Sequence, residues 1–385
     1  MDKKLVDFVK DYYETNEFIP LHEPRFNGLE KELVNETISS TFVSSVGKFV
    51  AQFEEDFSKF IEIPKSVAVV NGTAALYMSL YQCDVQRDDL VITQALTFVA
   101  TANAVHQLGA ECVFIDVSPS TLGMCPIALE NYLIEHATLN EDGNCIHKKS
   151  GKRFKAVVPM HTFGFPVEID KIQEICAKWH ISLVEDAAES LGSYFKNKHT
   201  GTFGRVSAFS FNGNKIITTG GGGMVVCNSM DDADHVKHLT TTAKVAHPYK
   251  FYHDEAAFNY RMPNLNAALG CAQLDKLSMF VEQKRKLAKK YQSLLEGSNL
   301  MFFTEPVNTK ANYWLNTIIC EDVDHRDSML NYLNNNNVMS RPVWDLMTDL
   351  PMYKHCESDS LRHSRWFADR IINIPSSVRN FHYEK

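Results

Sequence analysis

Short, continuously apolar runs alternate with helix-like segments over the first two thirds of the chain. Apolar residues recur with helical spacing at 73–82, 97–108 and 168–179, between runs that have the length of strands. The strand candidates are SVAVVNG (66–72), DLVITQ (89–94), ECVFIDV (111–117), KAVVPMH (155–161), SLVEDAA (182–188), VSAFSF (206–211) and GGMVVC (222–227). Continuous rather than alternating hydrophobicity indicates strands buried on both faces of a mostly parallel sheet. The pattern predicts an α/β fold whose large domain has about seven strands.

The pattern changes after Asn228. A long helix-compatible stretch covers 265–295, and the pieces YWLNTIIC, HRDSMLNYLNNN, VMSRPV and RIINIP that follow are typical of a small α+β domain. The opening letters, MDKKLVDFVKDYYE, have the spacing of an amphipathic helix. We therefore expect an N-terminal helical segment (1–60), a large domain (61–264), and a linking helix with a small C-terminal domain (265–385).

The segment 138–155 interrupts the α/β pattern with turn residues and charge, TLNEDGNCIHKKSGKRFK. Such composition predicts a surface insertion. Its four basic residues are Lys148, Lys149, Lys152 and Arg153, and a contact between them and a substrate phosphate is the alternative.

Composition and charge narrow the classes of function. The 385 residues are 44% hydrophobic with a net charge of -8, which gives no support to a nucleic-acid partner. No run has the length of a membrane span, and the N-terminus lacks the apolar block of a signal peptide. The nine cysteines are scattered without a repeated spacing, which argues against a disulfide framework or a zinc knuckle. We expect a cytoplasmic protein with neither a membrane nor a nucleic-acid partner.

Polar groups gather where the predicted strands end. In VVNGTAAL a strand leads through Gly72 into a helix, so the N–H groups of Thr73 and Ala74 and the Thr73 hydroxyl form either a phosphate site or a simple N-cap. In LVEDAAES an apolar strand ends on Glu185 and Asp186, where an unpaired carboxylate would be costly. A cationic partner is therefore expected there.

The stretch SFNGNKIITTGGGG supplies the remaining group. Ser210 offers a hydroxyl, Lys215 an amine, and Gly220 to Gly223 a turn that lets the backbone approach a ligand closely. A lysine for a Schiff base, a carboxylate for a pyridine nitrogen and a helix start for a phosphate are what a pyridoxal phosphate enzyme requires. The carboxyl edge of an α/β sheet is also where such ligands bind. The sequence predicts pyridoxal 5'-phosphate as cofactor.

Ordered blocks along nearly the whole chain resemble the DegT/StrS family of sugar-nucleotide aminotransferases, which have the fold type I pyridoxal phosphate architecture. The blocks are NGTAAL, TFVATANAV, PMHTFGFPVEIDKI, VEDAAESLGS, SFNGNK with its glycines, and NYRMPNLNAALGCAQL. Within that family, FIPLHEPRFNGLEK, SSTFVSSVGKFV, SFNGNKIITTGGGGM and SRPVWDLM resemble the branch that makes UDP-4-amino sugars for legionaminic acid and related nonulosonic acids.

The resemblance implies roles for the matching positions. Lys215 would form the Schiff base and carry a proton between the substrate carbon and the cofactor. Asp186 would pair with the pyridine nitrogen, Glu189 would lie near the phenolic oxygen, and Phe98 would stack on the ring. A departure from the family is the run of four glycines, because many relatives have Gly-Glu-Gly-Gly there. This difference affects the loop rather than the lysine.

The phosphate contacts implied by the resemblance come from two chains. Gly72, Thr73, Ala74 and Ser210 would hold the phosphate, joined by Asn259 of NYRM from the neighbouring subunit. The expected assembly is therefore a homodimer with shared active sites.

Several of these residues also have an ordinary structural interpretation. Phe98 could be core, Ser210 could merely finish a strand, and Asn259 could be a loop residue. His161, at a buried strand end, is more often a satisfied structural group than an acid or base, and it is left out of the catalytic set.

The resemblance also implies the reaction, transfer of an amino group from glutamate to C4 of a UDP-linked 4-keto-6-deoxy-2-acetamido hexose. Arg25 of HEPRF and Arg341 of SRPVW are candidates for binding the sugar nucleotide. No metal is expected. The alternatives are a dehydratase on the same scaffold, a transfer to another nucleotide-linked keto sugar, and a non-catalytic regulator. Lys215 and the scattered cysteines disfavour the dehydratase, and no segment is long enough for the DNA-binding module of a regulator.

Overall fold

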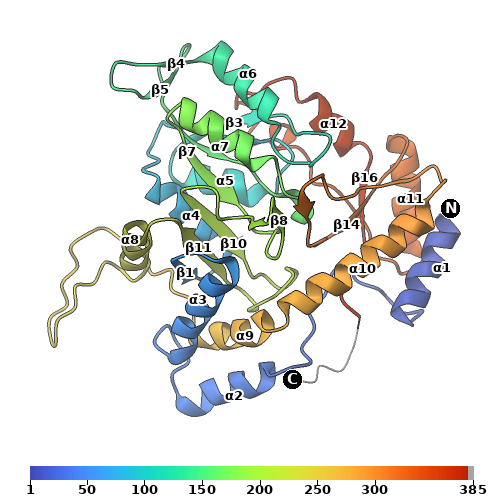
Figure 1. The fold of residues 1–385 in the computed structure, drawn as a ribbon, viewed down its shortest axis with the longest axis horizontal. Helices are drawn as coiled ribbons and strands as arrows, with labels where there is room; N and C mark the ends of the chain where they lie inside the picture. Colours follow the sequence, from blue (N-terminus) through green and yellow to red (C-terminus); the bar gives the residue numbers. More distant parts are fainter. Residues whose placement is uncertain (380–385) are drawn as a thin grey trace.

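A seven-stranded sheet forms the centre of the computed structural model, which describes residues 1–379 (Figure 1). Its strands, in spatial order, are β1 (Lys65–Val69), β11 (Gly223–Cys227), β10 (Val206–Ser210), β7 (Ser182–Asp186), β6 (Phe154–Val158), β2 (Leu90–Gln94) and β3 (Glu111–Ile115). The sheet is parallel except for β11, which pairs antiparallel with both β1 and β10. The predicted α/β fold and its seven-stranded, mostly parallel sheet are confirmed.

Helices cover both faces of this sheet, as continuous hydrophobicity requires. One face packs on α4 (Gly72–Gln82), α5 (Val99–Gln107) and α8 (Met230–Thr240). The other face packs on α3 (Lys48–Ile61), α6 (Pro126–His136), α7 (Ile169–Lys178) and α9 (Asn264–Leu274). Alternate residues of one strand therefore enter different cores: Val67 and Val69 of β1 face α4, and Ala68 between them faces α3.

Five of the seven predicted runs extend past the carboxyl end of their strand. The predicted 155–161, for example, stops at Val158, and 182–188 stops at Asp186. Most residues beyond these ends are buried, Met160 and Ala187 among them, but they belong to loops rather than to the sheet. The apolar runs in the sequence continue past the strands because loops at the carboxyl edge of the sheet are themselves buried.

A second sheet of four strands lies in the C-terminal part of the chain. Its order is β12 (Met301–Phe302), β14 (Asn316–Ile319), β16 (Ile371–Ile374) and β15 (Arg341–Pro342), with α11 (Val323–Asn335) against it and α12 (Arg362–Ala368) before β16. Short pieces complete the described chain: α2 (Glu30–Ser40), the hairpin of β8 (Tyr194–Phe195) and β9 (Lys198–His199) with β13 (Thr309–Lys310), and 3-10 turns at Thr162–Gly164 and Met347–Asp349. The α+β character predicted for this region matches the observed elements, whereas the exact domain boundaries stay a prediction.

The first helix, α1 (Asp2–Tyr13), packs far from its neighbours in sequence. Leu5, Val6 and Val9 enter a core with Ile318 and Ile372 of the C-terminal sheet. Ile19 continues this contact, because its amide donates to Asn337 and its carbonyl accepts from Met339. The expected N-terminal segment 1–60 thus serves two cores, since α3 packs on the large sheet instead.

The predicted helix 265–295 is two helices, α9 and α10 (Leu277–Leu295), the second of which runs as a long rod toward the C-terminal sheet (Figure 1). The break falls at Asp275 and Lys276. Lys276 is buried there and forms an ion pair with buried Glu30, and its amine also donates to the Arg25 carbonyl and to Asn27. This polar cluster fixes α2 against the break.

The insertion 138–155 folds back as a hairpin of β4 (Ala137–Leu139) and β5 (Cys145–His147) rather than as an irregular loop. Three of its basic side chains form hydrogen bonds and ion pairs with other groups of the same chain. Lys148 donates to two carbonyls at the end of α6, Lys152 pairs with Glu111 at 2.6 Å, and Arg153 grips Asp89 at 2.9 and 3.0 Å. Asp89 directly precedes β2, so the insertion lies at the amino edge of the parallel strands. These positions do not favour the alternative of a substrate-phosphate contact.

None of the helices in residues 1–379 combines the length and the apolar character needed to cross a membrane.

Removal of the buried carboxylate at the α9–α10 break should destabilise the protein. Glu30→Gln leaves the Lys276 ammonium buried without a counter-charge, and we expect the free energy of unfolding to fall by about 3 kcal/mol. Urea denaturation followed by circular dichroism measures this. Glu55→Gln is the matched control, because the Glu55–Lys59 pair is exposed, and it should leave the midpoint unchanged. Equal midpoints for Glu30→Gln and the parent protein would contradict the role given to the pair.

Candidate active site

A cavity of about 270 Å³ opens at the carboxyl edge of the large sheet. Loops after β1, β7 and β10 form its floor, α4 and α5 form one side, and two tryptophans from the C-terminal part of the chain form the other. Its lining comprises Asn71, Gly72, Thr73, Leu76, Phe98, Ala100, Thr101, Met160, Asp186, Ala188, Glu189, Ser210, Asn212, Asn214, Lys215, Gly222, Trp314 and Trp344. The structure thus brings together most of the residues that the sequence singled out.

The start of α4 points into this cavity. The N–H groups of Gly72 and Thr73 precede the first helical hydrogen bond, so they are free to meet an anion. Ala74 differs from the prediction, because its N–H already donates to Oδ1 of Asn71 at 2.8 Å. Its amide is therefore used by the N-cap, which is observed at Asn71, whereas the phosphate site at Gly72 and Thr73 stays a prediction. Ser210 lies against Gly72, where an added Cβ would be 2.7 Å from the serine Cβ.

Glu185 and Asp186 end β7 in opposite environments because successive strand residues face opposite sides. Burial favours the neutral form of Glu185, but the hydrogen bond from His161 and the amides of Gly201 and Gly204 outweigh it and hold its pKa below the usual range. His161 accepts the Val167 amide at Nδ1, so its proton sits on Nε2, 3.0 Å from Glu185. These contacts give His161 the structural role expected of it.

Asp186 faces the cavity with fewer partners. Its carboxylate accepts the Thr101 hydroxyl at 2.7 Å and the Ala188 amide at 3.1 Å. Burial raises its pKa, and these hydrogen bonds oppose the rise only in part. The partners of Asp186 are therefore a hydroxyl and an amide, where the sequence predicted a cation. A cationic group of a ligand in the cavity could pair with this buried carboxylate.

Lys215 lies between a carboxylate and an indole. Its amine is 3.2 Å from Oε1 of Glu189 and 4.1 Å from the centre of the Trp314 ring. Burial raises the pKa of Glu189 to about 7, although Lys215 and the Phe163 amide act against the shift. The Glu189 carboxyl can accordingly gain or lose a proton near neutral pH.

Phe98 is 47% exposed and belongs to the cavity wall rather than to the core. It is the extended residue that precedes α5, which explains why this helix begins at Val99 and not at residue 97. Its ring meets Trp344 edge-on, with the centroids 6.0 Å apart. An exposed aromatic in the wall of this cavity is placed to cover a planar ligand.

Four predicted site residues are absent from the lining of the cavity, Ala74 as described above and Arg25, Arg341 and Asn259. Arg25 donates to the Val378 carbonyl at 2.7 Å and pairs with Glu23 at 2.6 Å, so its guanidinium is engaged within its own chain. Arg341 is exposed on β15. Asn259 is exposed on the segment after α8, which extends away from the body of the molecule at the left of Figure 1.

The sequence analysis missed several residues of the cavity lining, Thr101, Trp314 and Trp344 among them, and it also missed His22 near Lys215. Thr101 could have been found, because it lies one turn into the helix that follows Phe98. Trp314 and Trp344 come from the C-terminal part and carry no local signal. His22, in the block that supplied Arg25, has a buried Nδ1 without a partner in the described chain, and burial followed by the charges of Lys284, Arg25 and Lys215 lowers its pKa well below the usual range.

The four glycines differ in the space around them. An added Cβ at Gly223 would lie 2.4 Å from the Asn71 carbonyl oxygen, and one at Gly222 would lie 2.2 Å from the Thr219 hydroxyl. Gly220 has a φ of 80°, which favours glycine. Of the four, Gly221 alone combines room for a side chain with a φ outside the left-handed region, and its closest neighbour is 4.0 Å from the added Cβ. This is the position where many relatives have glutamate, so the departure from the family pattern falls where a side chain fits.

The residues present fit pyridoxal phosphate. Free amides at a helix start suit its phosphate, the buried Asp186 suits a protonated ring nitrogen, and Lys215 suits its aldehyde. An added Cβ at Gly72 would clash with Ser210, so no side chain at this position can block the free amides of the helix start. The fold and cavity together define a pyridoxal phosphate-dependent enzyme with the aminotransferase fold.

Comparison with known proteins identifies the family. The model of the DegT/DnrJ/EryC1/StrS aminotransferase family matches residues 25–381. A GDP-perosamine synthase from Vibrio cholerae is 36% identical over 361 residues, covering 93% of this chain and 94% of the relative. A second, from Escherichia coli O157:H7, is 33% identical with 93% of each covered. The crystal structure of the aminotransferase TlmJ from Streptoalloteichus hindustanus superposes with a TM-score of 0.83 at 26% identity, with 93% of each chain covered.

The chain belongs to the DegT/DnrJ/EryC1/StrS aminotransferase family. It is a pyridoxal phosphate-dependent sugar aminotransferase, as the sequence predicted. The two relatives described above are named for a GDP-linked product rather than for the legionaminic-acid branch, so that closer resemblance stays a prediction.

The raised pKa of Glu189 predicts a pH-dependent stability for the apoenzyme. A carboxyl with a pKa of about 7 in the native state and 4.5 in the unfolded chain contributes stability that is complete below about pH 4.5 and is lost as the pH rises through about 7. The melting temperature of the parent should therefore fall relative to that of Glu189→Gln across this window. Thermal scans at half-unit pH steps measure it, with the exposed Glu174→Gln as control. A constant difference between parent and Glu189→Gln would refute the raised pKa.

Proposed function

We propose that this enzyme transfers an amino group from glutamate to the C4 carbonyl carbon of a nucleotide-linked 4-keto-6-deoxy hexose. The observation that carries the proposal is the convergence of Lys215, Asp186 and the start of α4 on one cavity. The cofactor, when bound, supplies an electron-accepting ring and holds the amino group between the two half-reactions.

In this proposal each residue acts through a contact already described. The Gly72 and Thr73 amides and the Ser210 hydroxyl hold the phosphate, and Asp186 keeps the ring nitrogen protonated. Thr101 positions Asp186, since its hydroxyl bonds one carboxylate oxygen at 2.7 Å. Phe98 covers one face of the ring.

Lys215 binds the cofactor and moves the proton at the substrate carbon. A lysine does this only when its amine is uncharged, and Glu189 at 3.2 Å is close enough to take up the proton that it releases. The Trp314 ring beneath the amine restricts its direction of approach and excludes water from that side. Glu189 and Trp314 are therefore positioning residues, whereas Lys215 touches the reacting atoms.

The nucleotide has two candidates. The blocks SSTFVSSVGKFV and SRPVWDLM support a UDP-linked 2-acetamido sugar, in line with the legionaminic-acid branch. The names of the relatives at 36% and 33% identity support a GDP-linked sugar. The UDP sugar is the first candidate of this proposal and the GDP sugar is the second.

A panel of 4-keto-6-deoxy sugar nucleotides tests the function. UDP-linked 2-acetamido and GDP-linked sugars are each incubated with glutamate and the holoenzyme, and mass spectrometry detects the amino product. We expect kcat/KM for the UDP sugar to exceed that for the GDP sugar at least tenfold. Lys215→Ala should form no product from either. A preference for the GDP sugar would overturn the nucleotide assignment alone, and the absence of amino sugar from every substrate would overturn the reaction.

We further propose that two chains share each active site through Asn259. Its segment carries Tyr249, Phe251 and Tyr252, which are 79%, 84% and 61% exposed. Adjacent exposed aromatics on an extended arm favour burial against a second copy. Asn259 is exposed and is not among the residues that line its own cavity, which agrees with a phosphate contact in the neighbouring subunit.

Mixed dimers test this sharing. Asn259→Asp sets a negative charge against the phosphate with little change in size, so this variant alone should bind the cofactor poorly. In hybrids of Lys215→Ala and Asn259→Asp chains, one site carries both defects and the other carries neither. With random exchange half of the dimers are hybrids, and activity should recover to about a quarter of the parent level. Verified exchange without recovery would show that Asn259 does not serve a partner's site.

A further inference from the structure

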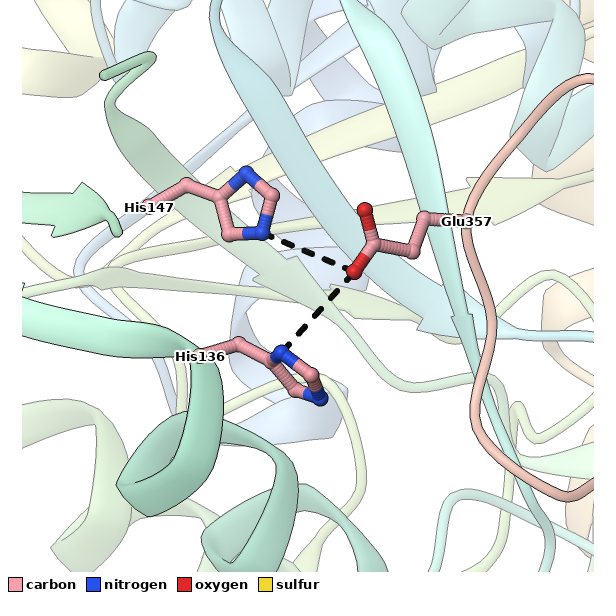
Figure 2. A group of neighbouring side chains, drawn as sticks. All are labelled: His136, His147 and Glu357. Atoms are coloured by element: carbon pink, nitrogen blue, oxygen red, sulfur yellow. Dashed lines mark ion pairs between the residues drawn. The ribbon is translucent and has the colours of Figure 1, made fainter. Parts of the chain in front are cut away.

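We propose that His136, His147 and Glu357 form a site for a divalent transition-metal ion, with Zn²⁺ as the fitting representative. The three side chains come from separate parts of the chain and converge on one point (Figure 2). His136 ends α6, His147 ends β5 of the insertion hairpin, and Glu357 lies in the loop before α12. Two imidazoles with one carboxylate form a donor set typical of zinc.

The distances suit a common ligand. The Nε2 atom of His147 is 3.5 Å and the Nδ1 atom of His136 is 4.0 Å from the same oxygen, Oε1 of Glu357. All three ligand atoms lie within 4.8 Å of one another. Ligands at about 2.1 Å from a tetrahedral metal are about 3.4 Å apart, so small rotations of side chains would close the site.

His147 supplies an independent sign of a missing partner. Its side chain is only 4% exposed, yet Nε2 makes no hydrogen bond within the described chain. Nδ1 is bonded to the Ser150 hydroxyl at 2.8 Å, which fixes the ring and leaves Nε2 aimed at the carboxylate. A buried nitrogen facing an oxygen at 3.5 Å is poorly satisfied, and a cation between the two atoms would satisfy both.

Glu357 is held in place by its surroundings. The Tyr132 hydroxyl donates to Oε1 at 2.9 Å, from the turn of α6 that precedes His136. The Glu357 carbonyl accepts the amide of Phe114 in the edge strand β3 at 2.9 Å. Partners of this kind orient the ligands of metal sites. The carboxylate is thus positioned by its neighbours rather than by the histidines alone.

The surrounding charges favour a cation. Glu135 is 3.8 Å from the far nitrogen of His136, and its carboxylate adds negative potential. The nearby amine of Lys148 is turned away, because it donates to the carbonyls of Ile134 and Glu135. His136 and Glu357 are each about one third exposed, so the fourth position of the metal would face solvent and ions could enter.

A metal here would join three segments that the sequence separates by up to 221 residues, from His136 to Glu357. It would tie the insertion hairpin and α6 to the C-terminal loop. The insertion lies at the amino edge of the sheet, whereas the proposed catalytic cavity lies at the carboxyl edge. The inference is therefore independent of the proposed function, and the site would act on stability rather than on the reaction.

Metal binding by the holoenzyme tests the inference. The protein is stripped with chelator and titrated with Zn²⁺ and, for its visible spectrum, with Co²⁺. We expect one equivalent per chain, a tetrahedral Co²⁺ spectrum, and a rise in melting temperature on binding. His136→Ala and Glu357→Gln should each raise the dissociation constant about tenfold or more and abolish the rise in melting temperature.

Matched controls separate this site from surface binding. His180→Ala removes an exposed histidine that touches the same insertion, and Glu135→Gln removes the neighbouring carboxylate that is not a ligand. His180→Ala should keep the parent affinity within about twofold, and Glu135→Gln, which removes only a solvent-screened charge, should weaken binding less than the ligand variants do. The inference is overturned if the parent binds no equivalent of Zn²⁺, or if His136→Ala and Glu357→Gln, folded as judged by circular dichroism, bind as tightly as the controls.

Discussion

The structure depends on how two adjacent carboxylates are accommodated at the end of one buried strand. Glu185 points to the side where His161 and backbone amides satisfy it, and it anchors the loop that leads into β10. Asp186 points to the opposite side with two hydrogen bonds and an open cavity before it. Burying a carboxylate with too few partners costs free energy. A cationic group of a ligand that pairs with this carboxylate removes part of that cost and therefore binds more tightly. Glu189 is likewise a buried carboxylate in this cavity, and its cationic partner is Lys215.

The fold was largely predictable because its determinants are local. Strands buried on both faces give continuous apolar runs, and all seven predicted runs correspond to strands of the observed sheet. Errors arose where tertiary contacts overrode the local pattern. The stretch 265–295 has unbroken helical character, but the structure divides it at Asp275 and Lys276, where Lys276 forms a buried pair with Glu30, far away in sequence. Similarly, no local signal tells that α1 leaves the segment 1–60 to pack on the C-terminal sheet.

The site was predictable to the extent that its residues follow strand ends. Lys215, Asp186, Glu189, Ser210 and Phe98 all line the cavity because parallel strands deliver their carboxyl ends to one edge. Trp314 and Trp344 could not be found, since they reach the cavity only after the C-terminal part has docked. Arg25 does not line the cavity for a different reason: its guanidinium is engaged by its own chain, as the bond from Arg25 to Val378 illustrates, and its contact with the sugar nucleotide stays a prediction.

The packing of α1 has a consequence for synthesis on the ribosome. Leu5 and Val9 find their apolar partners in Ile318 and Ile372, and Ile19 finds its backbone partners at Asn337 and Met339. The helix α1 therefore stays without its native contacts until the strands β14 and β16 have been translated, whereas the large sheet needs nothing beyond Cys227 to pair its strands. Docking of α1 thus requires the closure of a long loop, with its entropic cost, and until then the apolar face of α1 is exposed to chaperones.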